Sequence, residues 1–382
     1  MPQTNLVEDQ PVPDVSSHAP ADVRLWVALD VHKLSIVAAT LPPAGGQPEV
    51  QRIETTERAI RRLIGRLGGA DGLAVAYEAG PGGFDLLRLL SRIGVRCDVI
   101  APSLVPVRAG DRVKTDRRDA TKLVRLYRAG ELSFVAAPDQ QTEGLRDLMR
   151  CRDDLRCAER RRVTASPSSC CVTAGSIATA ARSGPSATSR GCIASAWTTP
   201  LAHAALEQML CHLEGLDRQL ARLDGDIEQV AASGPWREQV AALTAFRGIS
   251  TRTALGLIAE IGDFRRFAHP RELASWLGIT PTEYSSGDQQ HRGHITKTGN
   301  RHARRLLIET AWHYRHRPRH PTTGRPRSDR AWHAEVRLHR RHHDLIQRGK
   351  RSTIVNVAIA RELAAFLWAE MTCQPHHRKA TA

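Results

Sequence analysis

Hydrophobic and polar positions divide the first third of the chain into short elements. Apolar runs of strand length lie at 25–31 (LWVALDV) and 35–41 (SIVAATL), and a third strand pattern follows a Pro-Gly turn at 49–56 (EVQRIETT). After them, amphipathic helix patterns (ERAIRRLIGRLGG, GGFDLLRLLSRIG) alternate with strand patterns (GLAVAYEAG, VRCDVIAP), and a helix is predicted from about residue 115 to 129. Three strands followed by alternating helix and strand predict an α/β domain with a mixed sheet.

The remainder of the chain is predicted to be mainly helical. Charged helical patterns at 143–162 and from about 204 onward indicate a helical, coiled-coil arm over 141–235. Two helices around the turn FRGIST resemble a helix-hairpin-helix, in which backbone N–H groups hold a DNA phosphate, although a plain helical hairpin fits equally well. We predict a domain at 22–140, the arm, a C-terminal domain at 236–372 that closes with an amphipathic helix at 352–371, and tails at 1–21 and 373–382.

One segment, at about residues 163–200, does not fit this plan. It contains no acid and three cysteines, is rich in Ser, Ala and Thr, and has no apolar period. Its Pro, Gly and β-branched residues disfavour helix, and a Cys-Cys pair is unusual in a flexible linker. Our hypothesis is that it is translated from the wrong frame, through two compensating indels or sequencing errors. Resequencing tests this, and the hypothesis fails if no other frame encodes a helical, basic segment.

Composition indicates the kind of partner and the compartment. The formal net charge of +15 indicates a polyanion such as nucleic acid, or less often an anionic membrane. We find no run of about 18 apolar residues and no signal peptide, so we expect no membrane association and a cytoplasmic, bacterial protein, located at the nucleoid when bound to DNA. The eight cysteines lack CxxC spacing, which indicates neither a disulfide framework nor a cysteine zinc site.

Four acidic residues fall at positions that suit a metal site. Asp30 ends the first predicted strand, Glu78 ends the fourth, and Asp116 and Asp119 share one face of the helix that follows. An acid at the end of a buried strand is costly unless it is paired or binds something. If the four converge, Mg²⁺ or Mn²⁺ would relieve their repulsion, and two ions about 4 Å apart can clamp a phosphoryl transfer. Taken singly, each also has a structural explanation as a cap, an ion-pair partner or a solvated helix face.

A serine and a basic patch mark the C-terminal domain. Ser285 and Ser286 lie in a polar Tyr-Ser-Ser-Gly loop, a sequence that alone is an ordinary loop. Basic residues able to bind DNA phosphates follow: Arg292, Lys297, Arg301, Arg304 and Arg305. The His- and Arg-rich stretches after residue 312 lack a companion set of metal ligands, and we interpret them as solvated basic segments that contact a nucleic-acid backbone.

The segments ALDVHK, YEAGPGG and KTDRRDA resemble the three acidic motifs of the DEDD insertion-sequence transposases (insertion sequence family one-ten). The resemblance covers about residues 24–160 and 205–370 and implies an RNase H-like, resolvase-like catalytic domain. It implies that the four acids hold metal and that Ser286, with Ser285 in the variable slot, is the nucleophile. It also implies a recombinase that works through a serine–DNA phosphodiester and is guided by an element-encoded RNA. Because the acids and the serine lie in different predicted domains, the site must be assembled by domain or subunit contact, and we expect a dimer or tetramer on DNA.

Two alternatives remain open on the residues themselves. The first is a resolvase-type nuclease that cleaves by metal-assisted attack of water, with Ser286 only structural. The second is an inactive copy that binds nucleic acid without chemistry. A covalent adduct indicates the recombinase, metal-dependent nicks without an adduct indicate the nuclease, and salt-dependent binding alone indicates the inactive copy.

Overall fold

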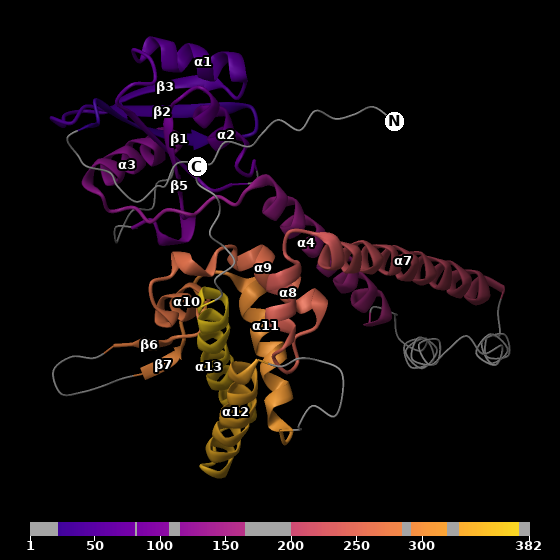
Figure 1. Cartoon of the computed structure of the whole chain (residues 1–382). Coiled ribbons are helices and arrows are strands. Elements are labelled where there is room, and N and C mark those ends of the chain that lie inside the picture. The colour runs from indigo at the N-terminus through magenta and orange to yellow at the C-terminus, as the bar shows by residue number, and fades with distance from the viewer. Residues whose placement is uncertain are drawn as a thin grey trace. The chain divides into compact units, whose positions relative to one another are not determined.

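The computed structural model describes residues 22–80, 82–106, 115–164, 200–284, 292–318 and 328–373. The chain forms two compact units, Met1–Ala137 and Pro138–Ala382 (Figure 1). The predicted tail at 1–21, nearly all of the tail at 373–382 and most of the segment 163–200 lie outside the described residues. The finer predicted division of the second unit into an arm and a C-terminal domain stays a prediction.

The first unit contains the predicted mixed sheet. Its strands are β1 (Leu25–Val31), β2 (Ser35–Leu41), β3 (Glu49–Glu54), β4 (Leu73–Glu78) and β5 (Arg96–Ile100), in the spatial order β3-β2-β1-β4-β5. The two pairs β1–β2 and β2–β3 are antiparallel, while β1–β4 and β4–β5 are parallel. The central pair β1–β4 is therefore parallel, and both strands end at the same edge of the sheet.

Helices pack on both faces of this sheet. They are α1 (Glu57–Arg66), α2 (Asp85–Arg92) and α3 (Asp116–Ala129), and a 3-10 turn, η2 (Pro102–Leu104), follows β5. Because successive strand residues point to opposite faces, the sheet has two cores. Val27 and Leu29 of β1 lie in one core with apolar residues of α1 and α2. Trp26 and Ala28 lie in the other core, with apolar residues of α3. Even-numbered β1 residues thus face α3.

The second unit is mostly helical. Its long helices are α4 (Gln140–Thr164), α7 (Pro200–Ser233), α12 (Asp329–Gln347) and α13 (Ser352–Cys373). Shorter helices and 3-10 turns lie between them: α8 (Arg237–Thr244), α9 (Thr251–Ile261), η3 (Phe264–Arg266), α10 (Pro270–Trp276), α11 (Arg301–Ala311) and η4 (Trp312–Arg315). A small antiparallel pair, β6 (Pro281–Glu283) and β7 (Arg292–Ile295), precedes α11.

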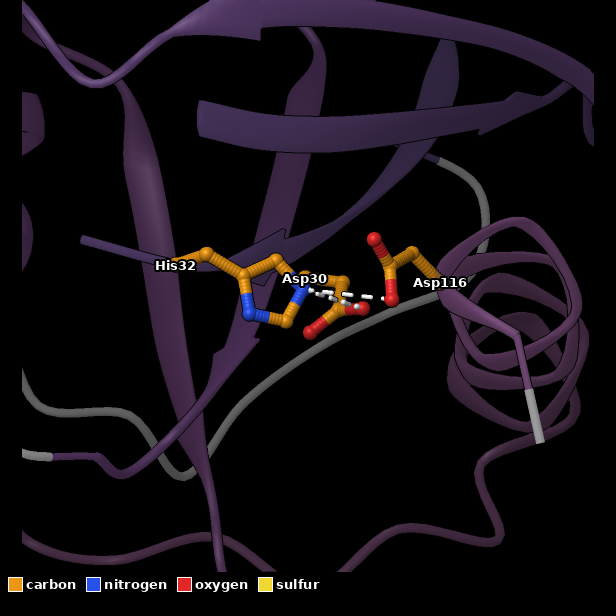
Figure 2. Close-up of side chains that lie close together, drawn as sticks. All are labelled: Asp30, His32 and Asp116. Atoms are coloured by element: carbon orange, nitrogen blue, oxygen red, sulfur yellow. Dashed lines mark hydrogen bonds and ion pairs between the residues drawn. The ribbon is translucent and has the colours of Figure 1, made fainter. Parts of the chain in front are cut away.

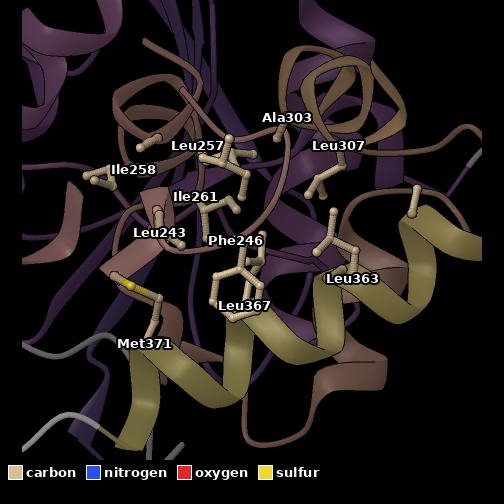
Figure 3. Close-up of a cluster of buried hydrophobic side chains, with 14 of the residues drawn as sticks. Leu243, Phe246, Leu257, Ile258, Ile261, Ala303, Leu307, Leu363, Leu367 and Met371 are labelled. Atoms are coloured by element: carbon tan, nitrogen blue, oxygen red, sulfur yellow. The ribbon is translucent and has the colours of Figure 1, made fainter. Parts of the chain in front are cut away.

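A single apolar core holds these helices together. Figure 3 shows Leu243, Leu257, Leu307 and Leu363 meeting from α8, α9, α11 and α13. Residues of the predicted arm, Leu145 in α4 and Ile227 and Ala231 in α7, belong to this same core. The start of α4 and the end of α7 are therefore anchored in the core of the second unit.

Helix α13 is long and rich in apolar residues. By length and composition it could cross a membrane, although it contains no unbroken run of about 18 apolar residues. Its buried residues include Val355, Ile359, Leu363 and Leu367, and the helix packs against α10, α11 and α12. Its apolar character is explained by this position in the core.

Helix α12 also differs from the solvated basic segment expected there. Ala331, Ala334 and Leu338 line a buried face of α12, while most of its basic residues lie on the other sides. Two of the four buried residues of α12 are alanines, so the helix has few large apolar residues to mark its buried face in the sequence.

The predicted hairpin forms between α8 and α9, and its turn makes intramolecular contacts. Gly248 has φ +80°, and a Cβ added there would lie 2.6 Å from the His313 side chain. The adjacent Arg247 pairs with buried Glu335 at 2.7 Å and donates to the carbonyl oxygens of His316 and Arg317. The turn is therefore held within the second unit, and a DNA contact at this hairpin stays a prediction.

Candidate metal centre

Strands β1 and β4 place two of the predicted acids side by side. Leu29 pairs with Tyr77 in the parallel register, so Asp30 and Glu78 are the next residues along each strand. Both acids continue the even-numbered series that faces α3 in β1 and β4. Both are half-buried. The sequence prediction that strand ends bring these acids to one edge of the sheet agrees with this register.

Helix α3 presents the other two acids to the same face. Its N-cap is Thr115, whose hydroxyl accepts a hydrogen bond from the Arg118 N–H at 3.3 Å, and Asp116 is its first residue. Asp116 lies four and eleven residues before Ala120 and Tyr127, which are buried against the sheet, so it starts the buried face of the helix. The beginning of α3 therefore points Asp116 toward the end of β1.

Three side chains meet at this point. His32 Nε2 lies 3.2 Å from Asp30 Oδ2 and 3.5 Å from Asp116 Oδ1 (Figure 2). One ligand atom from each residue lies within 4.8 Å of the other two. The side chains of His32 and Asp116 are almost half exposed, at 45% and 49%. The cluster is thus open enough for a phosphate group to reach it.

The electrostatics of the cluster favour a cation. Burial raises the pKa of the Asp30 carboxyl, and repulsion from Asp116 and Asp119 raises this pKa further. The charge and the hydrogen bond of His32 act in the opposite direction. Asp119 is therefore close enough to influence Asp30, although it is not one of the three clustered residues. A bound cation would favour the charged form of Asp30.

A buried contact on the same helix fixes α3 to the sheet. The Tyr127 hydroxyl donates to Asp98 Oδ2 at 2.5 Å and lies 3.4 Å from the Val75 carbonyl oxygen. The Trp26 ring meets the Tyr127 ring edge-on, with centroids 4.7 Å apart. Because Trp26, Val75 and Asp98 belong to β1, β4 and β5, one tyrosine joins α3 to three strands.

The residues present fit a divalent cation. Carboxylate oxygens from a strand end and a helix start, with an imidazole nitrogen between them, form a donor set that such an ion accepts. The cluster contains Asp30 and Asp116, the influence of Asp119 is electrostatic, and Glu78 shares the face. His32 was not among the predicted site residues, all of which in the first unit are acids. The signal was its position two residues after Asp30, which places both side chains on the same side of an extended chain.

Comparison with known proteins decides the family. Residues 27–166 match the transposase family DEDD_Tnp_IS110, and residues 240–324 match the family described as Transposase IS116/IS110/IS902 family. Putative transposase y4qE of Sinorhizobium fredii is 38% identical over 380 residues, covering 94% of this chain and 92% of that protein. The transposase of insertion sequence element IS1533 from Leptospira borgpetersenii is 27% identical, over 76% of this chain and 86% of that protein. The chain belongs to the IS110/IS116/IS902 family of transposases.

Membership of this transposase family indicates which reaction the Asp30–His32–Asp116 cluster serves. As a transposase, the protein binds DNA and transfers phosphoryl groups on it, and its DEDD-type domain implies a divalent metal. The first unit is the DEDD, RNase H-like domain, since the match at 27–166 spans β2 to β5, most of β1 and α3. Asp30, His32 and Asp116 all lie within that match.

The predicted nucleophile of this transposase lies in the second matched segment. Ser285 and Ser286 fall between β6 and β7, in the stretch 285–291 outside the described residues. The preceding residue, Tyr284, has 79% of its surface exposed. The roles of the two serines remain predictions.

The predicted phosphate-binding residues of the transposase differ in their surroundings. Lys297 and Arg301 are exposed. Arg304 donates to the carbonyl oxygens of Leu277 at 2.8 Å and Thr298 at 3.3 Å, and Arg305 pairs with Asp153 and Glu309. Arg292 is in β7, and its side chain lies outside the described residues. Of the predicted phosphate-binding residues whose side chains the structure describes, Lys297 and Arg301 are therefore the two most accessible to DNA.

Proposed function

We propose that this transposase cuts and rejoins DNA through a covalent serine–DNA intermediate. The Ser286 hydroxyl attacks the scissile phosphorus, the bond from phosphorus to the 3′-oxygen breaks, and the leaving oxygen takes a proton to become a free 3′-hydroxyl. The serine proton passes to a neighbouring base or to solvent. Because the phosphodiester is conserved in the serine ester, the reverse attack by a 3′-hydroxyl rejoins DNA without ATP.

The observation that carries this proposal is the Asp30–His32–Asp116 cluster in a transposase of this family. Asp30, Glu78, Asp116 and Asp119 are the proposed ligands, and Mg²⁺ or Mn²⁺ held there would polarise the phosphate. Ser286 belongs to the second unit and the acids to the first. The proposal therefore requires that Ser286 of the same protomer, or of a partner subunit, reaches the cluster on DNA, which favours a dimer or tetramer.

A structured RNA encoded by the insertion sequence is the proposed guide. The family resemblance implies this RNA, and the net charge of +15, with many of the basic residues in the second unit, suits an RNA backbone as well as a DNA backbone. Arg292, Lys297, Arg301, Arg304 and Arg305 are the residues proposed to contact nucleic acid. The proposed place of action is the bacterial cytoplasm, at the nucleoid.

A covalent-trapping experiment tests the serine mechanism. The full-length protein is incubated with element-junction DNA, RNA transcribed from the element's flank and Mg²⁺, then denatured, and a protein–DNA adduct is sought. We expect an adduct that persists in Ser285→Ala and is lost in Ser286→Ala and in Asp30→Ala.

The other outcomes identify the alternatives. Metal-dependent nicks without an adduct would mean that water is the nucleophile and that the enzyme is a resolvase-type nuclease. Salt-dependent DNA binding without nicks or an adduct would indicate an inactive copy, and the segment 163–200 would then be the first part of the gene to resequence.

A further inference from the structure

The imidazole of His32 lies beside both acids of the cluster. Its Nε2 atom faces both clustered acids, 3.2 Å from an Asp30 oxygen and 3.5 Å from an Asp116 oxygen (Figure 2). The ligands of an octahedral ion at about 2.1 Å lie about 3 Å apart when adjacent. The separations around His32 are therefore close to those of neighbouring ligands on one ion.

The backbone holds His32 in this position from two sides. Its N–H donates to the Ser35 carbonyl oxygen at 2.9 Å, and its own carbonyl oxygen accepts from the Thr55 hydroxyl at 2.8 Å. These bonds close the turn between β1 and β2 and attach it to the end of β3. The imidazole is thus presented by a fixed backbone, as expected for a preorganised ligand.

Nitrogen in the donor set changes which ion the site prefers. Mg²⁺ favours oxygen ligands and keeps its water, whereas imidazole is a good ligand for transition-metal ions. The two carboxylates beside His32 suit Mn²⁺ as well as Mg²⁺. A site with Asp30, Asp116 and an imidazole would therefore discriminate between these two ions through the nitrogen.

We propose that His32 Nε2 is a direct metal ligand, together with Asp30 and Asp116, and that it makes the site prefer Mn²⁺ over Mg²⁺. This inference rests on the metal site of the proposed function and adds a ligand outside the four acids. The contrasting role for His32 is that of a counter-charge, which pairs with the acids only when no ion is bound and gives no metal–nitrogen bond.

Pulsed electron paramagnetic resonance of the Mn²⁺-loaded, full-length protein distinguishes these roles. Mn²⁺ bound to imidazole couples magnetically to the ligating nitrogen, and selective ¹⁵N labelling of histidine changes that coupling. We expect a histidine-derived coupling in the wild type and in His333→Ala, a control at an exposed histidine of α12. We expect its loss in His32→Ala and His32→Asn.

Calorimetric titration with each ion provides the second readout. We expect the wild type to bind Mn²⁺ at least about tenfold more tightly than Mg²⁺. Removing a residue that only hydrogen-bonds a metal ligand already changes metal affinity by about tenfold or more, so a direct ligand should have at least this effect. In His32→Asn, which offers an amide oxygen, the ratio of the two affinities should fall toward one. A wild-type Mn²⁺ complex without histidine coupling, or an unchanged ratio in both His32 variants, would overturn the inference.

The Asp30→Asn and Asp116→Asn variants separate failure of this inference from failure of the metal site. If they weaken Mn²⁺ binding while no histidine coupling is found, the site stands and the His32 assignment is wrong. If they leave Mn²⁺ binding unchanged, or if the wild type binds no Mn²⁺, both the proposed site and the assignment are wrong. Circular dichroism of each variant confirms that it is folded.

Discussion

The Tyr127 hydroxyl donates a 2.5 Å hydrogen bond to the Asp98 carboxylate, and both side chains are 2% exposed. Burial raises the pKa of Asp98, whereas this hydrogen bond lowers it. Burial raises the pKa of Tyr127 as well, so the phenol keeps the proton that it donates. The contact lies eleven residues beyond Asp116 on the same face of α3, and it ties the helix that carries Asp116 to the strands beside Asp30.

Replacing Tyr127 with phenylalanine removes one oxygen and keeps the aromatic packing on Trp26. Because a buried carboxylate then loses a donor, we expect the free energy of unfolding of the first unit to fall by about 1–3 kcal/mol. The ligands on α3 should also shift relative to Asp30, so Mn²⁺ affinity should fall. Thermal unfolding and metal titration measure the two effects. Unchanged stability and affinity in Tyr127→Phe would show that the contact does not position α3.

A second buried acid links α4 to the core of the second unit. Glu260 of α9 is 4% exposed and accepts hydrogen bonds from Arg150 Nε at 2.8 Å and Asn300 Nδ2 at 2.7 Å. Glu260→Gln removes the charge that holds Arg150, and we expect a loss of about 3 kcal/mol in chemical unfolding. The control is Glu309→Gln, in an exposed pair with Arg305, where we expect less than about 1 kcal/mol. Equal effects of the two substitutions would contradict the structural role of Glu260.

The pairing of Glu260 with Arg150 also predicts how the stability of the protein depends on pH. Burial acts to raise the pKa of Glu260, but the hydrogen bonds and charges of Arg150, Asn300 and Arg146 outweigh it and leave the pKa below its ordinary value of 4.5. Since the folded pKa is the lower one, the stabilisation is complete above the unfolded pKa and is lost as the pH falls through the folded one. The stability difference between wild type and Glu260→Gln should therefore be constant from about pH 6 to 8 and shrink below about pH 4. Unfolding curves measured across this pH range test the lowered pKa of Glu260. A stability difference between wild type and Glu260→Gln that grew as the pH fell would contradict it.

Replacing exposed cations of the second unit should change how DNA binding depends on salt concentration. Lys297→Gln combined with Arg301→Gln removes two charges that are available to phosphates. We expect weaker binding to duplex DNA and a log–log salt slope smaller by about 1.8, since each lost contact contributes about 0.9. The matched control is Arg58→Gln with Arg62→Gln, two exposed arginines of α1. Identical slopes in the two double variants would argue against a DNA surface at Lys297 and Arg301.

The sequence predicted the first unit well because its signals are local and repeated. Strands β1, β2 and β4 are mostly apolar runs, β3 has apolar residues at Val50 and Ile53 among polar ones, and α1 and α3 begin after threonine caps. The parallel register of β1 and β4 follows from the order of elements, so the meeting of Asp30 with the start of α3 was predictable in outline.

The features that the sequence did not reveal depend on three-dimensional contacts. The spacing from Asp30 could point to His32, but the contact of His32 with Asp116, at 3.5 Å, depends on where the start of α3 lies. Strands β6 and β7 have three and four residues, too few for a clear period. Arg304 and Arg305 appeared equivalent to Arg301 in sequence, yet their partners, Leu277 and Asp153, come from distant segments.

The most direct test of the account is to identify the residue that becomes joined to DNA. Full-length protein trapped on element-junction DNA with Mg²⁺ and flank RNA is digested with nuclease and protease, and mass spectrometry locates the nucleotide-modified residue. We expect a nucleotide on Ser286, formed only when Asp30 and Asp116 are intact. A modification on another residue, or strand cleavage with no modified residue, would contradict it.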